Sequence, residues 1–195
     1  MLQKEKLEKL YKAGYSAKEI ADKLGYSESG IRYLMRKYSI PRRSMSEAIY
    51  VKNNPNGDPF LIKSYLTSAE EKLFGLGLGL YWGEGTKANK NAVKLSNSDP
   101  GLIKAFRNFL IRICQVRQEK IYYRLLLFNN ANKEKAIGFW ARELEIPVNK
   151  IASITKLKPR GKGSYKKKSQ TGVLTIEFGN TKLKKQIDQM IEGLR

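Results

Sequence analysis

Residues 75–85, Gly75-Leu-Gly-Leu-Gly-Leu-Tyr-Trp-Gly-Glu-Gly85, combine an apolar segment with five glycines and a single acid. Gly inside a helix costs roughly 1 kcal/mol relative to Ala, so this many glycines need a structural reason. In a helix, Gly75, Gly79 and Gly83 would share one face, because they are spaced four residues apart. A face without side chains lets a second backbone approach closely. The stretch therefore predicts a helix pair in which these three glycines form a dimer interface and bring Glu84 near its own copy.

The charge of the chain predicts a polyanionic partner. Its 38 Lys and Arg residues outnumber 18 Asp and Glu residues, which gives a net charge of +20. Nucleic acid is favoured over a membrane, because the sequence has no strongly basic amphipathic helix and no lipidation signal. Residues 75–85 are also too short to span a bilayer, which takes about 20 apolar residues. A charged surface that only keeps the protein soluble is the plainer alternative.

The residues that are missing exclude several classes of protein. The chain has no His, so it cannot hold a His-based catalytic triad, an HNH-type nuclease site or a His-ligated zinc. Its one cysteine, Cys114, lies on an apolar helix face and is expected in the core. No secretory signal region and no motif for a small-molecule cofactor are evident, so we expect a cytoplasmic protein associated with the nucleoid.

The first 43 residues contain the pattern of three short helices. Ser16 and Glu19 form a capping box at the start of the second helix. Ala21, Gly25 and Ile31 then follow the spacing A-x3-G-x5-I, in which a small residue lets two helices cross and the Gly permits a tight turn. Residues 5–43 resemble a helix-turn-helix of the resolvase and sigma-factor type, and a plain three-helix bundle is the alternative.

That resemblance implies that the third helix reads DNA in the major groove. The exposed residues expected to contact DNA from this helix are Ser27, Ser29, Arg32, Tyr33 and Arg36. Arg42 and Arg43 follow Pro41 and resemble a basic arm that contacts the DNA backbone or the minor groove. We therefore predict a DNA-binding domain over residues 1–43.

A linker and a mixed domain follow. Residues 44–66 are rich in turn formers and are expected to be a linker with a short helix near residues 46–51. The remaining chain, residues 67–195, is expected to be an α+β domain with helices on one face of a sheet. Its predicted helices cover residues 68–82, 100–114, 133–144 and 181–193, and its predicted strands cover residues 92–96, 121–128, 154–158 and 172–178.

The other face of the predicted sheet is expected to be basic. Residues 154–158 and 172–178 are interpreted as a hairpin around a loop that has seven cations and no acid between residues 154 and 170. Such a loop is either a solvated tip or a phosphate contact, and a β-ribbon in the major groove suits the second reading. The DNA-contacting candidates here are Lys94, Arg124, Lys156, Lys158, Arg160 and Lys162, with Lys94 and Arg124 expected on neighbouring strands.

Residues 67–194 resemble the LAGLIDADG homing endonucleases, whose domain has the order α-ββ-α-ββ-α. The segment Gly77-Leu-Gly-Leu-Tyr-Trp-Gly-Glu-Gly85 matches the nine-residue motif of that family. Gly79 falls on its interface glycine, Glu84 on its catalytic acid and Gly85 on its closing glycine, whereas Trp82 departs from the first Asp of the motif. Because the chain has a single motif, the resemblance implies a homodimer that binds a near-palindromic site.

The resemblance also implies a metal site. Glu84 and the backbone carbonyl of Gly83 would bind Mg²⁺, which activates water and stabilises the leaving oxygen. Lys87 is our candidate for polarising the scissile phosphate because it is close in sequence, although the resemblance does not place a Lys there. The plain alternative is that Glu84 is a helix-end carboxylate without a metal.

Two functions follow from these patterns. The first is a sequence-specific, homodimeric, Mg²⁺-dependent endonuclease of the homing type that cleaves double-stranded DNA. The second is a transcription regulator in which a catalytically inactive LAGLIDADG-like domain and the helix-turn-helix only bind DNA. Glu84 favours the first function, and Trp82 together with the unassigned catalytic Lys favours the second. An RNA-binding basic protein is a third, smaller possibility.

Overall fold

The chain forms two compact units, residues 1–59 and residues 60–195. In this computed structural model of the protein, the described residues are 2–128, 131–157 and 169–194. The expected linker, residues 44–66, contributes a helix to the first unit and its last residues, from Phe60 on, to the second. The expected α+β class is confirmed, with the whole sheet in the second unit.

The first unit is helical. Its helices are α1 (Lys4–Lys12), α2 (Ala17–Leu24), α3 (Glu28–Lys37) and α4 (Met45–Asn53). Leu7, Ile20 and Ile31, one from each of the first three helices, are fully buried and form the centre of its core. The predicted capping box at Ser16 is confirmed, and Gly25 ends α2 in the left-handed conformation, with a φ of 69°. Since only Gly adopts this conformation readily, Gly25 sets the turn between α2 and α3.

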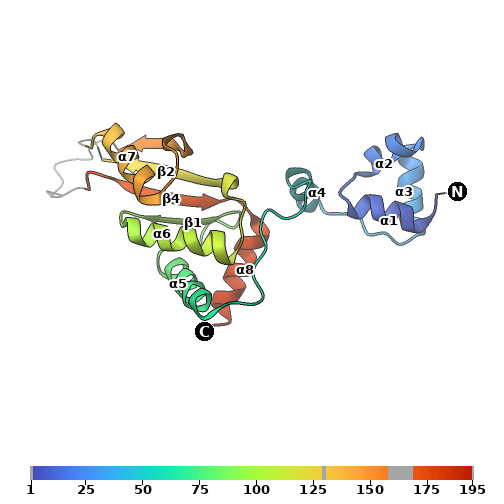
Figure 1. The fold of residues 1–195 in the computed structure, drawn as a ribbon. Helices are drawn as coiled ribbons and strands as arrows, with labels where there is room; N and C mark the ends of the chain where they lie inside the picture. Colours follow the sequence, from blue (N-terminus) through green and yellow to red (C-terminus); the bar gives the residue numbers. More distant parts are fainter. Residues whose placement is uncertain (1, 129–130, 158–168, 195) are drawn as a thin grey trace. The chain divides into compact units, whose positions relative to one another are not determined.

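The second unit contains a four-stranded sheet with its helices packed against one face. Its regular elements are α5 (Ser68–Glu84), β1 (Val93–Asn97), α6 (Pro100–Asn108), a π-helical segment (Phe109–Ile113), β2 (Ile121–Leu127), α7 (Lys133–Leu144), β3 (Ile151–Lys156), β4 (Val173–Phe178) and α8 (Thr181–Glu192), with short 3-10 turns at Gln118–Lys120 and Val148–Lys150. The strand order is β1-β4-β2-β3. Figure 1 shows the strands side by side in this order, with α6 and α7 crossing the same face.

Two expectations about this sheet were wrong. The predicted hairpin does not form, because β2 lies between β3 and β4 and pairs with β3 in parallel and with β4 in antiparallel orientation. Among the described residues, one strand, β1, lies between α5 and α6 and one strand, β2, lies between α6 and α7, so the order differs from the α-ββ-α-ββ-α that the resemblance implies. Parallel strands need a crossover connection, and α7 supplies it between β2 and β3.

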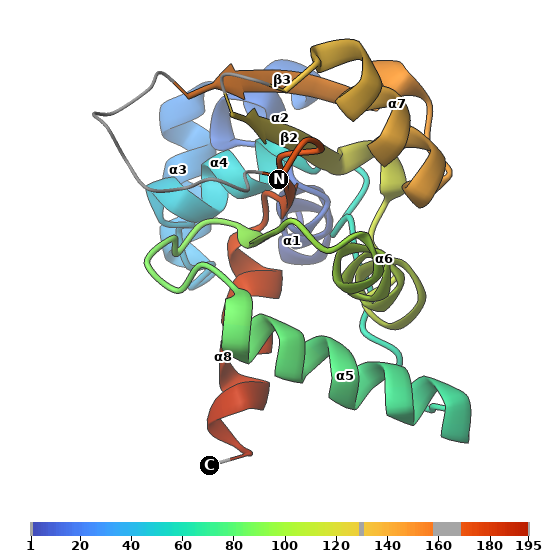
Figure 2. The same ribbon diagram turned by 90° about the vertical axis from the view of Figure 1, so that its left-hand side faces the viewer.

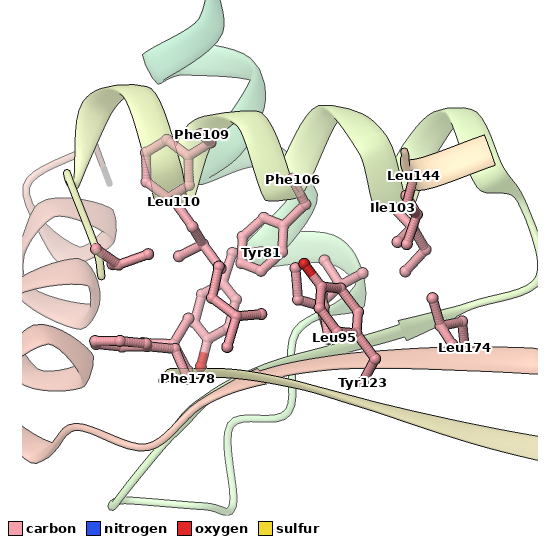
Figure 3. Close-up of a cluster of buried hydrophobic side chains, with 14 of the residues drawn as sticks. Tyr81, Leu95, Ile103, Phe106, Phe109, Leu110, Tyr123, Leu144, Leu174 and Phe178 are labelled. Carbon is pink, nitrogen blue, oxygen red and sulfur yellow. The ribbon is translucent and has the colours of Figure 1, made fainter. Parts of the chain in front are cut away.

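The core lies between the sheet and its helices. Figure 3 shows Phe106 and Leu110 pointing down toward Leu95, Tyr123 and Phe178 of the strands. The alternation predicted for β4 is confirmed, because Leu174, Ile176 and Phe178 are fully buried whereas the intervening residues are partly exposed. Burial also raises the pKa of the Cys114 thiol to about 12, in agreement with the expected core position.

Candidate nucleic-acid interface and acidic helix end

Helix α5 is fixed firmly at its N-terminal end. Thr67 is the N-cap and forms a capping box with Glu70. Glu70 also accepts a hydrogen bond from Lys63 Nζ at 2.7 Å. This bond, followed by that from the backbone of Thr67, lowers the pKa of Glu70. The helix then runs through Glu84, and within the described ranges no helix is long and apolar enough to cross a membrane.

On one face of α5, three glycines are not packed against any described residue of their own unit. A methyl group placed on Gly75, Gly79 or Gly83 would meet no atom within 4 Å. Two large apolar side chains flank this glycine face, and both are exposed: Leu76 by 49% and Trp82 by 42%. Figure 2 shows α5 at the lower edge of the unit, next to α6 and α8. The three glycines therefore share a face, as predicted, and this face is accessible within the described part of its own unit.

Gly77 lies on the opposite face of α5 and is tightly packed. A Cβ atom at this position would lie 2.1 Å from Cγ of Phe109, which no packed structure tolerates. Its neighbours Leu78 and Tyr81 are buried, and the Tyr81 ring stacks on Phe106 with centroids 5.8 Å apart. Gly77 is thus required by the core of the single chain, a role that the sequence pattern did not predict.

The C-terminal end of α5 presents Glu84 to solvent. Glu84 is the last helical residue and is exposed. Gly85 follows, and a Cβ atom there would lie 2.4 Å from the carbonyl oxygen of Tyr81. Gly85 also forms an antiparallel bridge with Leu95, so the chain leaves the helix along β1. The acid is therefore held at a defined helix end.

Lys87 closes this helix end. Its Nζ donates hydrogen bonds to the carbonyl oxygens of Tyr81, at 2.8 Å, and of Trp82, at 2.5 Å. Burial lowers the pKa of Lys87, and the charge of Lys184 lowers it further. A cation at this position satisfies carbonyls that the end of a helix leaves without intrahelical partners. The ammonium group is thus used as a helix cap.

The acidic end offers oxygen ligands of the type that Mg²⁺ prefers. They are the carboxylate of Glu84 and the backbone carbonyl of Gly83. Among the described residues, no group of three or more Asp, Glu, Cys or His side chains could hold a metal ion. A metal at Glu84 would therefore need further ligands from water, DNA or a second copy of the chain.

The outward face of α3 carries the predicted contact residues. Ser29, Arg32, Tyr33 and Arg36 are exposed, and the Tyr33 side chain is exposed by 58%. Ile31, Leu34 and Met35 point the other way, into the core. Ser27 caps α3 by accepting a hydrogen bond from the Gly30 N–H at 3.1 Å, and Arg32 Nε donates to Glu28 at 2.8 Å. Helical spacing thus brings four of the five candidates together and uses Ser27 as the cap.

Arg43, which was expected in a basic arm that contacts DNA, is held against the end of α1, and its contact with DNA stays a prediction. Its guanidinium donates to the carbonyl oxygens of Tyr11, Gly14 and Tyr15, at distances of 2.7–3.1 Å. The group also lies over the Tyr11 ring, 4.0 Å from the centroid. The Tyr11 carbonyl lies in the last turn of α1 and the other two follow the helix, where carbonyls lack intrahelical donors, which explains the role of Arg43. Arg42 beside it is exposed, as expected.

The outer sheet face, which we define as Lys94, Ser96, Tyr122, Arg124, Thr175 and Glu177, brings both predicted cations to one acid. Lys94 on β1 and Arg124 on β2 are not on neighbouring strands, because β4 lies between them. Both bond to Glu177 on β4, with Nζ at 3.1 Å and Nε at 2.8 Å from the same Oε2 atom. The two cations are therefore paired rather than free for phosphate.

Of the remaining basic candidates, one lies on β3 and three follow it in the sequence. Lys156 is exposed on this edge strand. Lys158, Arg160 and Lys162 lie outside the described residues. Tyr122, which was not among the predicted contact residues, is 57% exposed on the outer sheet face. Its alternation with the buried residues Ile121 and Tyr123 would have identified its side of the sheet.

Comparison with known proteins gives no relative for this arrangement. No family model, no curated protein and no solved structure matches the chain.

Proposed function

We propose that this chain is a sequence-specific protein that binds double-stranded DNA as a homodimer. The observation that carries the proposal is the outward face of α3. It presents Ser29, Arg32, Tyr33 and Arg36 together, directly after a glycine turn and an N-cap. This arrangement suits a helix that enters the major groove, where Arg reads guanine and Ser adapts to several bases. The net charge of +20 supports a phosphate backbone as the partner.

The glycine face of α5 supports pairing of two chains. Gly75, Gly79 and Gly83 leave the helix backbone accessible, and Leu76 and Trp82 supply exposed apolar area beside it. We expect Gly79→Leu to convert the dimer to a monomer in sedimentation equilibrium, because a large side chain would hold the two backbones apart. A Gly79→Leu variant that remained dimeric would show that the interface lies elsewhere.

DNA cleavage at Glu84 is the chemistry that we propose first. Pairing through the glycine face would bring two Glu84 carboxylates close to the two-fold axis, one for each DNA strand. Glu84 and the Gly83 carbonyl would hold Mg²⁺, which when bound lowers the pKa of water and offsets negative charge on the phosphate. Glu84 itself would orient the ion, and the Lys87 cap would keep the helix end rigid beneath it.

The use of Lys87 as a helix cap favours a second function, a transcription regulator. Its ammonium group bonds to the Tyr81 and Trp82 carbonyls, so polarising a phosphate would break these bonds. A dimer that binds DNA without a cation beside the phosphate would repress or activate rather than cut. In both functions, the protein binds DNA as the same homodimer.

Incubation with supercoiled plasmid libraries in Mg²⁺ separates the two. The nuclease predicts cuts that disappear with EDTA and in Glu84→Gln, while Glu71→Gln, an exposed acid in the first turn of α5, serves as the matched control. Cuts that persist in Glu84→Gln would contradict the assigned acid. Salt-sensitive binding to a selected site that is never cut would support the regulator.

DNA binding itself is tested by selection from a randomised duplex pool. We expect wild-type protein to enrich a two-fold symmetric motif, and Arg36→Ala to reduce affinity for it by roughly tenfold, the value of one good base contact. Lys6→Ala on α1 removes the same charge from another exposed position and is the control. Failure of the wild-type protein to bind or enrich any duplex would contradict the proposed function.

A further inference from the structure

Glu177 sits at the centre of the outer sheet face, where the chain would otherwise present two unpaired cations. It lies opposite Lys94 on β1 and opposite Tyr122 on β2. Lys94 Nζ lies 3.1 Å from its Oε2 and Arg124 Nε lies 2.8 Å from the same atom. The two cations come from strands on either side of β4, so one acid connects three strands.

Glu177 is charged in this setting. Its side chain is only 15% exposed, and burial alone would raise its pKa. The hydrogen bonds from Lys94 and Arg124 more than compensate, so the pKa is lowered overall. A carboxylate between two cations reduces the local charge and repels phosphate. For a chain that binds DNA by charge alone, an acid at this position is unfavourable.

Glu177 also orients Arg124. The bond uses Nε, the guanidinium donor nearest the backbone, while the side chain remains 51% exposed. The terminal Nη groups lie further out along that exposed side chain, and a guanidinium fixed in this way can donate two parallel bonds to guanine. Tyr122 lies two residues earlier on β2, is 57% exposed and offers an aromatic surface beside it.

We infer that Glu177 is a specificity-determining residue of the outer sheet face. It holds Arg124 toward base edges and makes the face a poor phosphate site, so that the face discriminates between DNA sequences. This inference rests on the proposed DNA-binding function. It assigns to the acid a role opposite to that of the cations around it: Glu177 lowers affinity for arbitrary DNA and raises selectivity.

The test compares Glu177→Gln with Glu145→Gln. Both variants remove one negative charge, and Glu145 is a 76% exposed partner of Lys104. Kd values would be measured over a range of salt concentrations for the duplex selected by wild-type protein and for a scrambled duplex. We expect Glu177→Gln to bind the scrambled duplex about threefold to tenfold tighter and to depend more steeply on salt. Its ratio of target to scrambled affinity should fall at least roughly tenfold, the cost of one lost base contact, while Glu145→Gln keeps the ratio.

Equal ratios in both variants would overturn the inference, because Glu177 would then act only through net charge. Arg124→Lys covers the case in which Glu177→Gln does not fold. It keeps the charge and the neighbouring acid but cannot bond a base bidentately. A similar fall in the ratio with an unchanged salt dependence supports the inference, and an unchanged ratio contradicts it. If the wild-type protein enriched no duplex, the proposed function itself would be contradicted, and this outcome differs from an unchanged affinity ratio.

Discussion

Glycine occurs on both faces of α5, but for opposite structural reasons. Gly77 faces the core, where Phe109 occupies the space that a Cβ atom would need. Gly79, two residues later, faces solvent, and a Cβ atom added there would meet no atom within 4 Å. One glycine is required by the fold of the single chain, whereas the other only weakens the helix unless something packs on it. The difference separates what the monomer needs from what a partner would need.

The largest expected effect is on the packed face. Gly77→Ala would force the Phe109 ring out of its position, and overpacking of this kind costs about 1–3 kcal/mol. We expect the free energy of unfolding of the second unit to fall by about 3 kcal/mol in urea denaturation. A loss below about 1 kcal/mol would mean that Phe109 moves aside easily and that the two faces are less different than their contacts indicate.

On the accessible face, replacing glycine by alanine should stabilise the second unit instead of destabilising it. At low protein concentration, Gly79→Ala should raise the free energy of unfolding by about 0.5–1 kcal/mol, because Ala is the better helix former and its methyl group meets nothing. At high concentration the same variant should dimerise less well than wild type in sedimentation experiments. Destabilisation of the dilute monomer would show that this face is packed within a single chain.

The C-terminal end of α5 tests the role of Lys87. Lys87→Met removes two hydrogen bonds to helix carbonyls and should cost about 1 kcal/mol. Hydrogen exchange of amides in the last turn of α5 should become faster, since that turn would open more often. Lys90→Met, an exposed site in the following loop, is the control and should leave both quantities unchanged.

The smallest expected effect on stability comes from the N-terminal end of α5, and this effect depends on pH. The pKa of Glu70 is lowered from its ordinary value of 4.5 by Lys63 and Thr67, so Glu70 binds fewer protons when folded than when unfolded. Its stabilising effect is therefore present above about pH 4.5 and is lost as the pH falls through the folded pKa. In Glu70→Gln, the Tm should decline less steeply with acid than in wild type, while Glu71→Gln should follow wild type.

Local patterns predicted the elements but not their pairing. The caps at Ser16 and Thr67 and the alternation of β4 depend on residues close together in sequence, so the sequence alone revealed them. The strand order depends on contacts between distant segments. As a result, the predicted hairpin was wrong, and the position of Glu177 between two cations could not be anticipated.

The same distinction between local and long-range features applies to the candidate site. Helical spacing correctly grouped Ser29, Arg32 and Tyr33 on one face of α3. Sequence proximity did not predict that Arg43 would satisfy carbonyls at the end of α1, because the acceptors lie about 30 residues earlier in the chain. Lys87 is the intermediate case: its nearness to Glu84 was visible in the sequence, but its bonds to the carbonyls of α5 were not.

The strand order has a consequence for how the second unit forms during synthesis. β4 lies between β1 and β2 in the sheet, yet the ribosome makes it after both, and the hydrogen-bonded pair Ser96 and Thr175 are 79 residues apart. Until β4 emerges, β1 and β2 lack the strand that joins them in the sheet. Such long-range pairing is slow and exposes aggregation-prone surface to the cell. We therefore expect a nascent chain of this protein to be most prone to aggregation before its central strand, β4, has been made.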